Sequence, residues 1–295
     1  MSDFILSCCS AVDLTHEQMD KYGINYIPFH FELNGVQYTD DLGKSVPYPE
    51  FYRRMSEGED TKTSQVNIDE FIQYFEGYLK EGKDVLHLTL SSGISGTFNS
   101  ARLAKDMLEE KYPDRKLYIV DSLAASGGYG LLMIKLGELK NSGKSIDEVY
   151  DFAENNKKKL NHWFFTSDLT FFIKGGRVSK TAGFVGQMLN ICPLLNVDFM
   201  GRLIPREKIR TKKKVIARIV DVMEEKVEGG RDYNGKVLIT QSYCEDDAKA
   251  VAALIEERFP KIDGKVEINY IGNLIGSHTG PGTVALFFWG EERTN

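Results

Sequence analysis

The chain has 295 residues, enough for a large hydrophobic core and for two domains of roughly 150 residues each. Apolar residues make up 42% and charged residues 27%, as in ordinary globular proteins, and no apolar run is long enough to cross a bilayer. The net charge of −6 disfavours a general nucleic-acid-binding protein. Because no basic leader precedes the first apolar run, we expect a cytoplasmic protein.

Strand-like and helix-like segments alternate through the first half of the chain, which predicts a mostly parallel sheet flanked by helices. Asn34-Gly35 is a strong hairpin signal between two short strands. We expect the helix that follows residue 97 to bury Met107 along with its other apolar side chains. The apolar runs predict strands at 5–8, 85–90 and 117–120, and amphipathic helices at 15–23, 48–55, 67–79, 130–139 and 145–157.

The second half predicts another α/β domain. The polar run at 155–159 is the best candidate for a boundary, so we expect domains at 1–159 and 160–295. The loop at 276–283 is expected to return to the interface between them. The predicted strands are 163–166, 191–197, 203–209, 237–240 and 266–270, and the predicted helices are 211–225 and a segment that begins near 246.

A polar turn between a predicted strand and a predicted helix is the first candidate site. It spans residues 91–97, Ser-Ser-Gly-Ile-Ser-Gly-Thr, which offer four hydroxyls and two glycines. A helix start carries unpaired N–H groups and a partial positive charge, which suit a phosphate or a carboxylate. Open α/β sheets also bind ligands at the carboxyl ends of their strands. The simpler alternative is a turn with a helix cap and no ligand.

Three further polar stretches accompany this turn. They are Thr63-Ser64-Gln65, a basic glycine loop at 174–180, and a Gly-Ser-His-Thr-Gly-Pro-Gly-Thr segment at 276–283. His278 lies among glycines, so we expect it in a loop, where functional residues are common. A lone histidine is more often a satisfied core residue, and that alternative stays open.

Catalytic and nucleotide motifs are weak or missing. The order Gly93-Ile94-Ser95-Gly96 misses the nucleophile elbow G-x-S-x-G by one position, so a serine-dependent acyl hydrolase that uses Ser95 and His278 is the alternative function. There is no P-loop and no dinucleotide fingerprint. The four cysteines include no C-x-x-C pair, so we expect buried free thiols and neither a metal site nor a disulfide framework.

A basic segment runs from residue 202 to residue 214, with seven Lys or Arg residues and one acid. It could be a solvated surface, a phosphate contact or a docking face for an acidic partner. A regulatory module for a phospho-ligand or a nucleic acid is a third class of function. Of these two ligands, a nucleic acid is the less favoured, because no aromatic residues that could stack on bases alternate with the basic residues.

Taken in this order, the polar stretches resemble the DegV family of fatty-acid-binding proteins, which includes the fatty-acid-binding subunit of bacterial fatty acid kinase. The resemblance covers most of the chain and implies two α/β domains with a long-chain fatty acid between them. The matching segments are Thr63-Ser64-Gln65, residues 90–101, Val120-Asp121-Ser122, residues 174–179 and residues 276–283.

The resemblance also implies roles for individual residues. The carboxylate would lie against hydroxyls and the helix start, and Arg177 and Arg210 would meet a kinase partner or the phosphate of an acyl phosphate. The protein would then be a carrier without catalytic residues or a cofactor, with no membrane span and no nucleic acid, although a transient membrane contact stays open. The expected carboxylate-binding residues are Thr63, Ser64, Ser95, Gly96, Thr97 and His278.

Two departures from the family pattern concern the site. Val66 stands where the family usually has a proline after Thr-Ser-Gln, which loosens the loop but keeps the hydroxyls. Cys8-Cys9 stands near the N-terminus where the family usually has Asp-Ser, so the role of that position is open.

Overall fold

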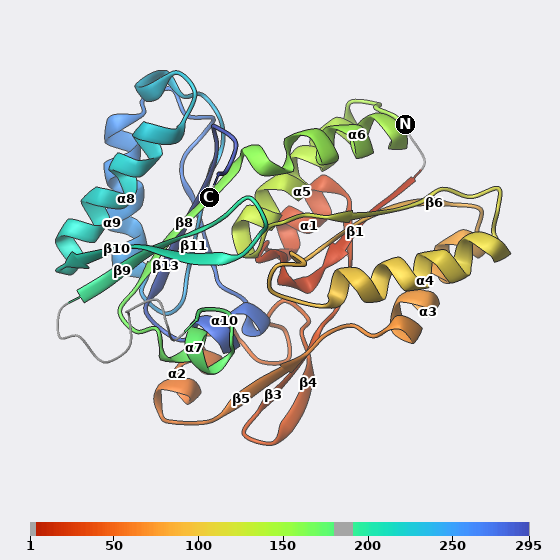
Figure 1. The fold of residues 1–295 in the computed structure, drawn as a ribbon, viewed down its shortest axis with the longest axis horizontal. Helices are drawn as coiled ribbons and strands as arrows, with labels where there is room; N and C mark the ends of the chain where they lie inside the picture. The colour runs from red at the N-terminus through yellow and green to blue at the C-terminus, as the bar shows by residue number, and fades with distance from the viewer. Residues whose placement is uncertain (1–3, 180–190, 295) are drawn as a thin grey trace.

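The computed structural model describes residues 4–179 and 191–294, and three β-sheets form its frame (Figure 1). The strand orders are β2-β1-β6-β7, β4-β3-β5 and β10-β9-β8-β13-β11-β12. The predicted class, α/β with a parallel sheet flanked by helices and a second sheet domain, is confirmed. Within the described residues, no helix is both long enough and apolar enough to span a membrane.

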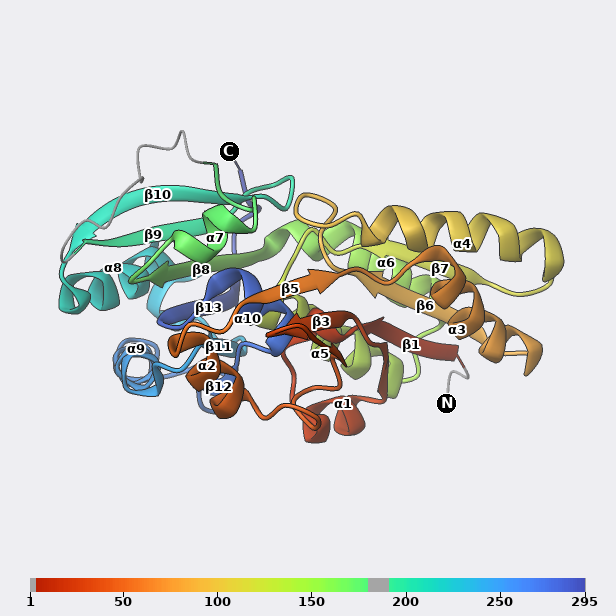
Figure 2. The ribbon, with the colours of Figure 1, turned by 90° about the horizontal axis from the view of Figure 1, so that it is seen from below.

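The first sheet is parallel and covered on both faces. Helices α3 and α4 pack together on one face, and α1, α5 and α6 lie on the other (Figures 1 and 2). Strands that are buried on both faces have continuous apolar sequences, which is why residues 85–90 could be predicted as a strand. The strands are β1 Phe4–Cys9, β2 Ile24–Ile27, β6 Asp84–Thr89 and β7 Leu117–Asp121. The helices are α1 His16–Tyr22, α3 Ile68–Lys80, α4 Thr97–Lys111, α5 Ser126–Asn141 and α6 Ile146–Asn156.

Two details of these helices differ from the prediction. Met107 is 60% exposed, because α4 buries only a narrow apolar stripe against the sheet. Helix α5 begins four residues earlier than expected and is not amphipathic, since it is enclosed between the first and second sheets. Its early start matters because its first residue, Ser126, lines a cavity between the sheets.

A small antiparallel sheet carries the first polar motif. Its strands are β3 His30–Leu33, β4 Val36–Thr39 and β5 Thr61–Ser64, and α2 spans Tyr48–Ser56. The predicted hairpin is confirmed, with positive φ angles at Asn34 and Gly35. The sequence did not indicate β5, because its short polar run lacks the apolar alternation of a strand.

The second large sheet is mixed. Its strands are β8 Leu160–Thr166, β9 Ile191–Val197, β10 Leu203–Arg210, β11 Val237–Gln241, β12 Glu267–Tyr270 and β13 Thr283–Trp289. The helices of this half are α7 Thr170–Lys174, α8 Lys212–Lys226, α9 Glu245–Arg258 and α10 Asn273–Thr279. Among these strands, only β13 was not predicted from the sequence. It lies in the interior of the sheet, between β8 and β11. Short 3-10 turns span Ser10–Val12, Lys157–Lys159 and Gly230–Asp232.

The largest buried cluster contains residues from both halves of the chain. It runs from Phe4 to Phe287, because α5 packs against both large sheets. The boundary between 159 and 160 falls where the turn Lys157–Lys159 meets β8. The division into two domains at that point stays a prediction.

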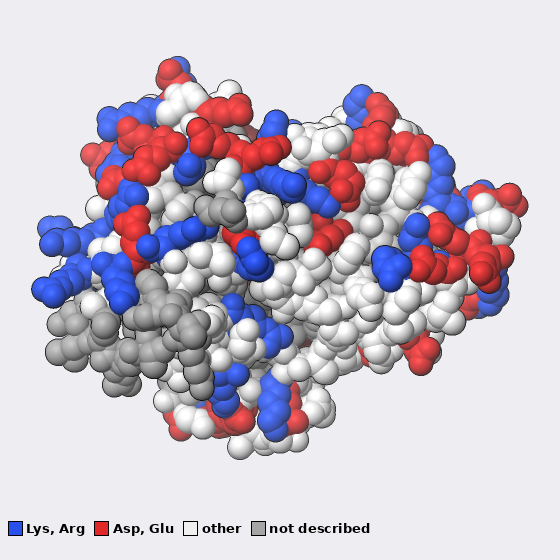
Figure 3. Space-filling view, viewed as in Figure 1, with Lys and Arg blue, Asp and Glu red and all other residues white. Residues whose placement is uncertain are grey.

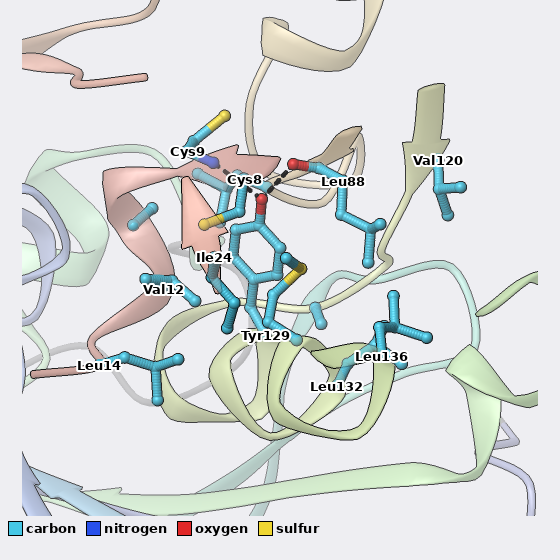
Figure 4. Packing of buried hydrophobic residues seen from close by; sticks show 14 of the residues in the cluster. Cys8, Cys9, Val12, Leu14, Ile24, Leu88, Val120, Tyr129, Leu132 and Leu136 are labelled. Carbon is cyan, nitrogen blue, oxygen red and sulfur yellow. Dashed lines mark hydrogen bonds between the residues drawn. The ribbon is translucent and has the colours of Figure 1, made fainter. Parts of the chain in front are cut away.

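Tyr129 is a buried polar anchor inside this cluster (Figure 4). Its hydroxyl accepts a hydrogen bond from the Cys9 N–H at 3.0 Å and donates one to the Leu88 carbonyl. It therefore satisfies two backbone groups at the ends of β1 and β6, where the parallel ladder stops. Cys8 and Cys9 are fully buried free thiols, and burial raises the pKa of Cys9 to about 12.

We expect Tyr129→Phe to lower the free energy of unfolding by about 1–3 kcal/mol, because both backbone partners would lose their hydrogen bond without access to water. The measurement is urea denaturation followed by circular dichroism. Tyr118→Phe is the control, since the Tyr118 hydroxyl bonds the exposed Asp147 and water can replace that contact. Equal losses in the two variants would contradict the role of Tyr129.

Candidate functional site

A cavity of about 650 Å³ lies where the three sheets meet. One end is polar and the walls are apolar. The polar end carries Thr63, Ser64, Gln65, Ser95, Gly96, Arg177 and His278. The apolar walls include Phe29, Leu90, Ile94, Phe164, Phe172, Val197, Leu203, Leu274, Ala285 and Phe287.

Strand β5 and helix α10 hold the polar end together. Thr63 Oγ1 lies 2.7 Å from His278 Nε2, and Thr61 Oγ1 lies 2.7 Å from Ser277 Oγ. The two threonines share one face of β5 because strand side chains alternate. The predicted loop position of His278 is wrong: it lies in the last turn of α10, which ends at Gly280 with a positive φ of 66°.

His278 is uncharged near neutral pH. Burial and the nearby Arg177 guanidinium lower the pKa of its imidazole to about 4. Gly175 leaves room for the ring, because a Cβ there would lie 2.5 Å from His278 Nδ1. The polar end is thus built from hydroxyls and a neutral imidazole, with one guanidinium beside them.

The Ser-Gly turn forms the opposite wall of the polar end. Ser91 Oγ donates to the Gly201 carbonyl at 2.9 Å and accepts from the Gly93 N–H at 3.1 Å. A Cβ at Gly93 would lie 2.6 Å from the Met200 carbonyl oxygen, so the hairpin between β9 and β10 closes directly onto this turn. Ser95 and Gly96 line the cavity at the start of α4, as the sequence predicts for the end of a parallel strand.

The remaining expected site residues lie in different surroundings. Ser64 lines the cavity, whereas Thr97 is fully buried at the start of α4 and is not part of the wall. Arg177 lines the cavity, donates to the Gly175 carbonyl and has no ion pair among residues 4–179 and 191–294. Burial lowers the pKa of its guanidinium. Arg210 is exposed at the end of β10 and away from the cavity wall.

The basic segment forms part of the molecular surface. Figure 3 shows Lys and Arg side chains gathered where β10 ends and α8 begins. Several of these charges are already paired: Arg202 with Asp198 at 2.7 Å and Lys212 with Asp247 at 2.8 Å. Lys180 lies outside the described residues. The pairing weakens the regulatory nucleic-acid hypothesis, since fewer cations are free for phosphates.

The geometry gives the hydrolase alternative no support. Ser95 Oγ accepts a hydrogen bond from the Thr97 N–H at 3.3 Å, and His278 Nε2 is engaged by Thr63. A nucleophilic serine needs a base within hydrogen-bond reach and a group that orients that base. Among the residues that the structure describes, no acid is hydrogen-bonded to His278.

Asp13 is a structural member of the site that the sequence did not reveal. Its carboxyl accepts from the Gly272 N–H at 2.9 Å, at the start of α10, and from Ser126 Oγ, at the start of α5. Ser126 lines the cavity. Burial raises the pKa of Asp13 to about 8, with a smaller contribution from Asp40. An aspartate before a helix is a common surface feature, so no sequence signal distinguished it.

One known protein family matches nearly the whole chain, including the segments that form the polar end. The family model described as "Uncharacterised protein, DegV family" matches residues 9–291. The chain belongs to the DegV family. The resemblance inferred from the polar stretches is thereby confirmed.

Several DegV relatives cover the full chain. A DegV domain-containing protein of Clostridium perfringens is 38% identical over 293 residues, which are 99% of each chain. A Thermotoga maritima structure, described as revealing a fatty-acid-binding function, is 30% identical, with a TM-score of 0.81 over 99% of this chain and 100% of that one. The Streptococcus pneumoniae fatty acid kinase B3 protein loaded with linoleic acid is 24% identical, with a TM-score of 0.84 over 99% and 100%, and shows the shared fold.

We expect the stability of this DegV protein to fall as the pH rises from neutrality through about 8. The folded state keeps the Asp13 proton that the unfolded state has already released, so folding takes up a proton in this range and stability declines with pH. Asp13→Asn should flatten that slope in melting temperatures measured across the range. The exposed Asp20→Asn is the control, and an unchanged slope in Asp13→Asn would contradict the assignment.

Proposed function

We propose that this DegV protein binds a long-chain fatty acid in the cavity, with the carboxylate at the polar end and the acyl chain between the apolar walls. The observation that carries the proposal is a cavity that combines apolar walls with a group of hydrogen-bonding residues that includes Thr63, Ser95 and His278. A volume of about 650 Å³ is in the range of small-molecule sites. The fatty-acid-binding function described for the Thermotoga maritima relative supports the same reading.

The polar end is suited to a carboxylate. Hydroxyls of Thr63 and Ser95 can donate charge-assisted hydrogen bonds, which are stronger than those between neutral groups. The start of α4 at Gly96 adds an N–H group and the positive end of a helix dipole. Ser64 and the neutral His278 complete the proposed set. No side chain has to lose a proton for the anion to bind.

The acyl chain supplies most of the binding free energy in this proposal. Each buried CH₂ contributes about 0.8 kcal/mol, and the aromatic and aliphatic walls keep water out. Arg177 lies between the cavity and the surface and lacks an acidic partner among the described residues. It can therefore neutralise part of the carboxylate charge while it keeps its hydrogen bond to the Gly175 carbonyl.

We further propose that the protein presents this carboxylate to a separate fatty acid kinase and does not itself catalyse a reaction. Arg177 and Arg210 would contact the kinase or the phosphate of the acyl phosphate. Arg210 suits a partner contact because it is exposed beside the basic surface of β10 and α8. A cytoplasmic location and a transient membrane contact stay predictions.

The proposed ligand can be tested by mass spectrometry of lipid extracted from natively purified protein. We expect a long-chain fatty acid in the extract, and stoichiometric uptake of oleate after the lipid is removed. Protein that carries no fatty acid and takes up neither oleate nor palmitate would refute the proposal.

The carboxylate position is tested by Thr63→Val and Ser95→Ala. Each variant loses one hydrogen bond to a charged group, so we expect roughly 10- to 100-fold weaker oleate binding by calorimetry. Thr39→Val on the exposed strand β4 of the same sheet is the matched control. Wild-type affinity in both site variants would place the carboxylate elsewhere.

The kinase role is tested with a bacterial fatty acid kinase catalytic subunit and oleate-loaded protein. We expect Arg210→Ala to leave oleate affinity unchanged and to lower acyl-phosphate formation at least about tenfold, because an interfacial arginine can contribute more than 1.4 kcal/mol. Arg102→Ala on the surface of α4 is the control. Absence of phosphorylation of wild-type-bound oleate would contradict the kinase role while leaving fatty-acid binding intact.

A further inference from the structure

One buried arginine in the C-terminal tail joins three distant segments of the chain. Arg293 follows β13 and is 6% exposed. Its Nη1 atom donates hydrogen bonds to the Leu123 carbonyl at 2.8 Å and to the Asp198 carbonyl at 3.0 Å. Its Nη2 atom donates to the Lys157 carbonyl at 3.2 Å. These carbonyls belong to the loop after β7, to the hairpin between β9 and β10, and to the turn after α6, so a single side chain holds all three.

The hairpin tip, residues 198–202, closes the cavity wall beside the Ser-Gly turn. Val197 comes directly before the tip and Leu203 directly after it, and both line the cavity. The tip lies against the turn, because Ser91 Oγ donates to the Gly201 carbonyl at 2.9 Å. Figures 1 and 2 show this hairpin reaching the loop that precedes α4. A movement of the tip away from the turn would therefore separate two parts of the wall.

The tip is a compact unit without an apolar anchor. The Asp198 carboxylate accepts from the N–H groups of Met200 and Arg202, each at 2.9 Å, and the Asp198 N–H donates to the Arg202 carbonyl at 3.0 Å. Met200 is 48% exposed, and neither Phe199 nor Met200 belongs to a buried apolar cluster of the described residues. The docking of the tip therefore depends mainly on its hydrogen bonds to the Ser-Gly turn and to Arg293.

The guanidinium of Arg293 is held in place at a cost. It has no ion pair among residues 4–179 and 191–294, and its Nε atom is buried without a hydrogen-bond partner there. Burial lowers the pKa of Arg293 to about 10, although the carboxylates of Asp198 and Asp121 act in the opposite direction. The group stays charged at neutral pH, and three carbonyls replace only part of its hydration. Because undocking would return the guanidinium to water, the docked state is favoured by less than its hydrogen bonds alone would suggest.

We propose that Arg293 holds the hairpin tip against the Ser-Gly turn and thereby sets the rate at which a ligand enters and leaves the cavity. With the tip docked, Val197 and Leu203 complete the wall, and with the tip undocked the wall is open. Entry and exit pass through the same open state, so a weaker hold accelerates both and changes the dissociation constant little. Arg293 is a positioning residue, since it does not line the cavity. This inference rests on the proposed fatty-acid function and concerns the regulation of its site.

The test measures rates as well as affinity. The delipidated full chain is mixed with cis-parinarate, a fluorescent polyunsaturated fatty acid, in a stopped-flow instrument, and release is followed by displacement with excess oleate. Arg293→Met keeps an unbranched side chain and removes every donor. We expect association and release to be at least about tenfold faster than in the wild type, while the dissociation constant changes by less than about threefold.

Three further variants assign the effect. Arg293→Lys keeps the charge and donors that can reach part of the carbonyls, so its release should be slower than that of Arg293→Met. Ser91→Ala cuts the other hydrogen bond of the tip and should also accelerate release. Arg258→Met is the matched control, because Arg258 is a partly buried arginine of α9 that pairs with Asp221 at 2.5 Å and does not line the cavity. Its release rate should equal that of the wild type even if its melting temperature falls.

The outcomes separate this inference from the proposed function. Release from Arg293→Met at the wild-type rate, or equally fast release from Arg258→Met, refutes the role of Arg293 and leaves fatty-acid binding in place. If Arg293→Met does not fold, Arg293→Lys and Ser91→Ala decide, and wild-type release rates in both refute the role. If the wild type binds neither cis-parinarate nor oleate, the proposed function is refuted together with this inference.

Discussion

The cavity depends on one constraint: a polar group that is removed from water must keep a hydrogen-bond partner or lose its charge. At the polar end this is met by pairing Thr63 with His278 and by holding the imidazole neutral. Beside the first sheet, the Tyr129 hydroxyl provides hydrogen-bond partners for backbone groups at the ends of β1 and β6. Sheets and helices are arranged so that these pairs form from distant segments, and the apolar walls fill the space between them.

Asp13 extends this principle to the architecture. Its carboxyl joins the starts of α5 and α10, and both helices contribute cavity residues. Ser126 also contacts Thr240 Oγ1 at 2.9 Å, which links the network to the second large sheet. A single buried carboxyl thereby fixes the starts of these two cavity-lining helices relative to each other.

The sequence predicted the parallel sheet and most of the second sheet because long apolar runs carry their own signal. The family resemblance carried by the polar motifs also predicted that Thr63, Ser95 and His278 share one site, and all three line the cavity. The sequence did not reveal β5 or β13, and it placed His278 in a loop. Whether a polar segment forms a strand depends on the neighbour that pairs with it, as Phe31 does with Thr63.

The position of β13 has a consequence for how the chain folds. This strand lies in the interior of its sheet between β8 and β11, yet it follows both of them in the sequence. Until β13 is in place, β8 and β11 each present an unpaired edge, which is a template for wrong pairing. Because the connection from β8 to β13 spans more than a hundred residues of sequence, closing it is a late and slow step of folding. A folding intermediate that lacks β13 therefore exposes both edges and also lacks the cavity wall that Thr283, Ala285 and Phe287 provide.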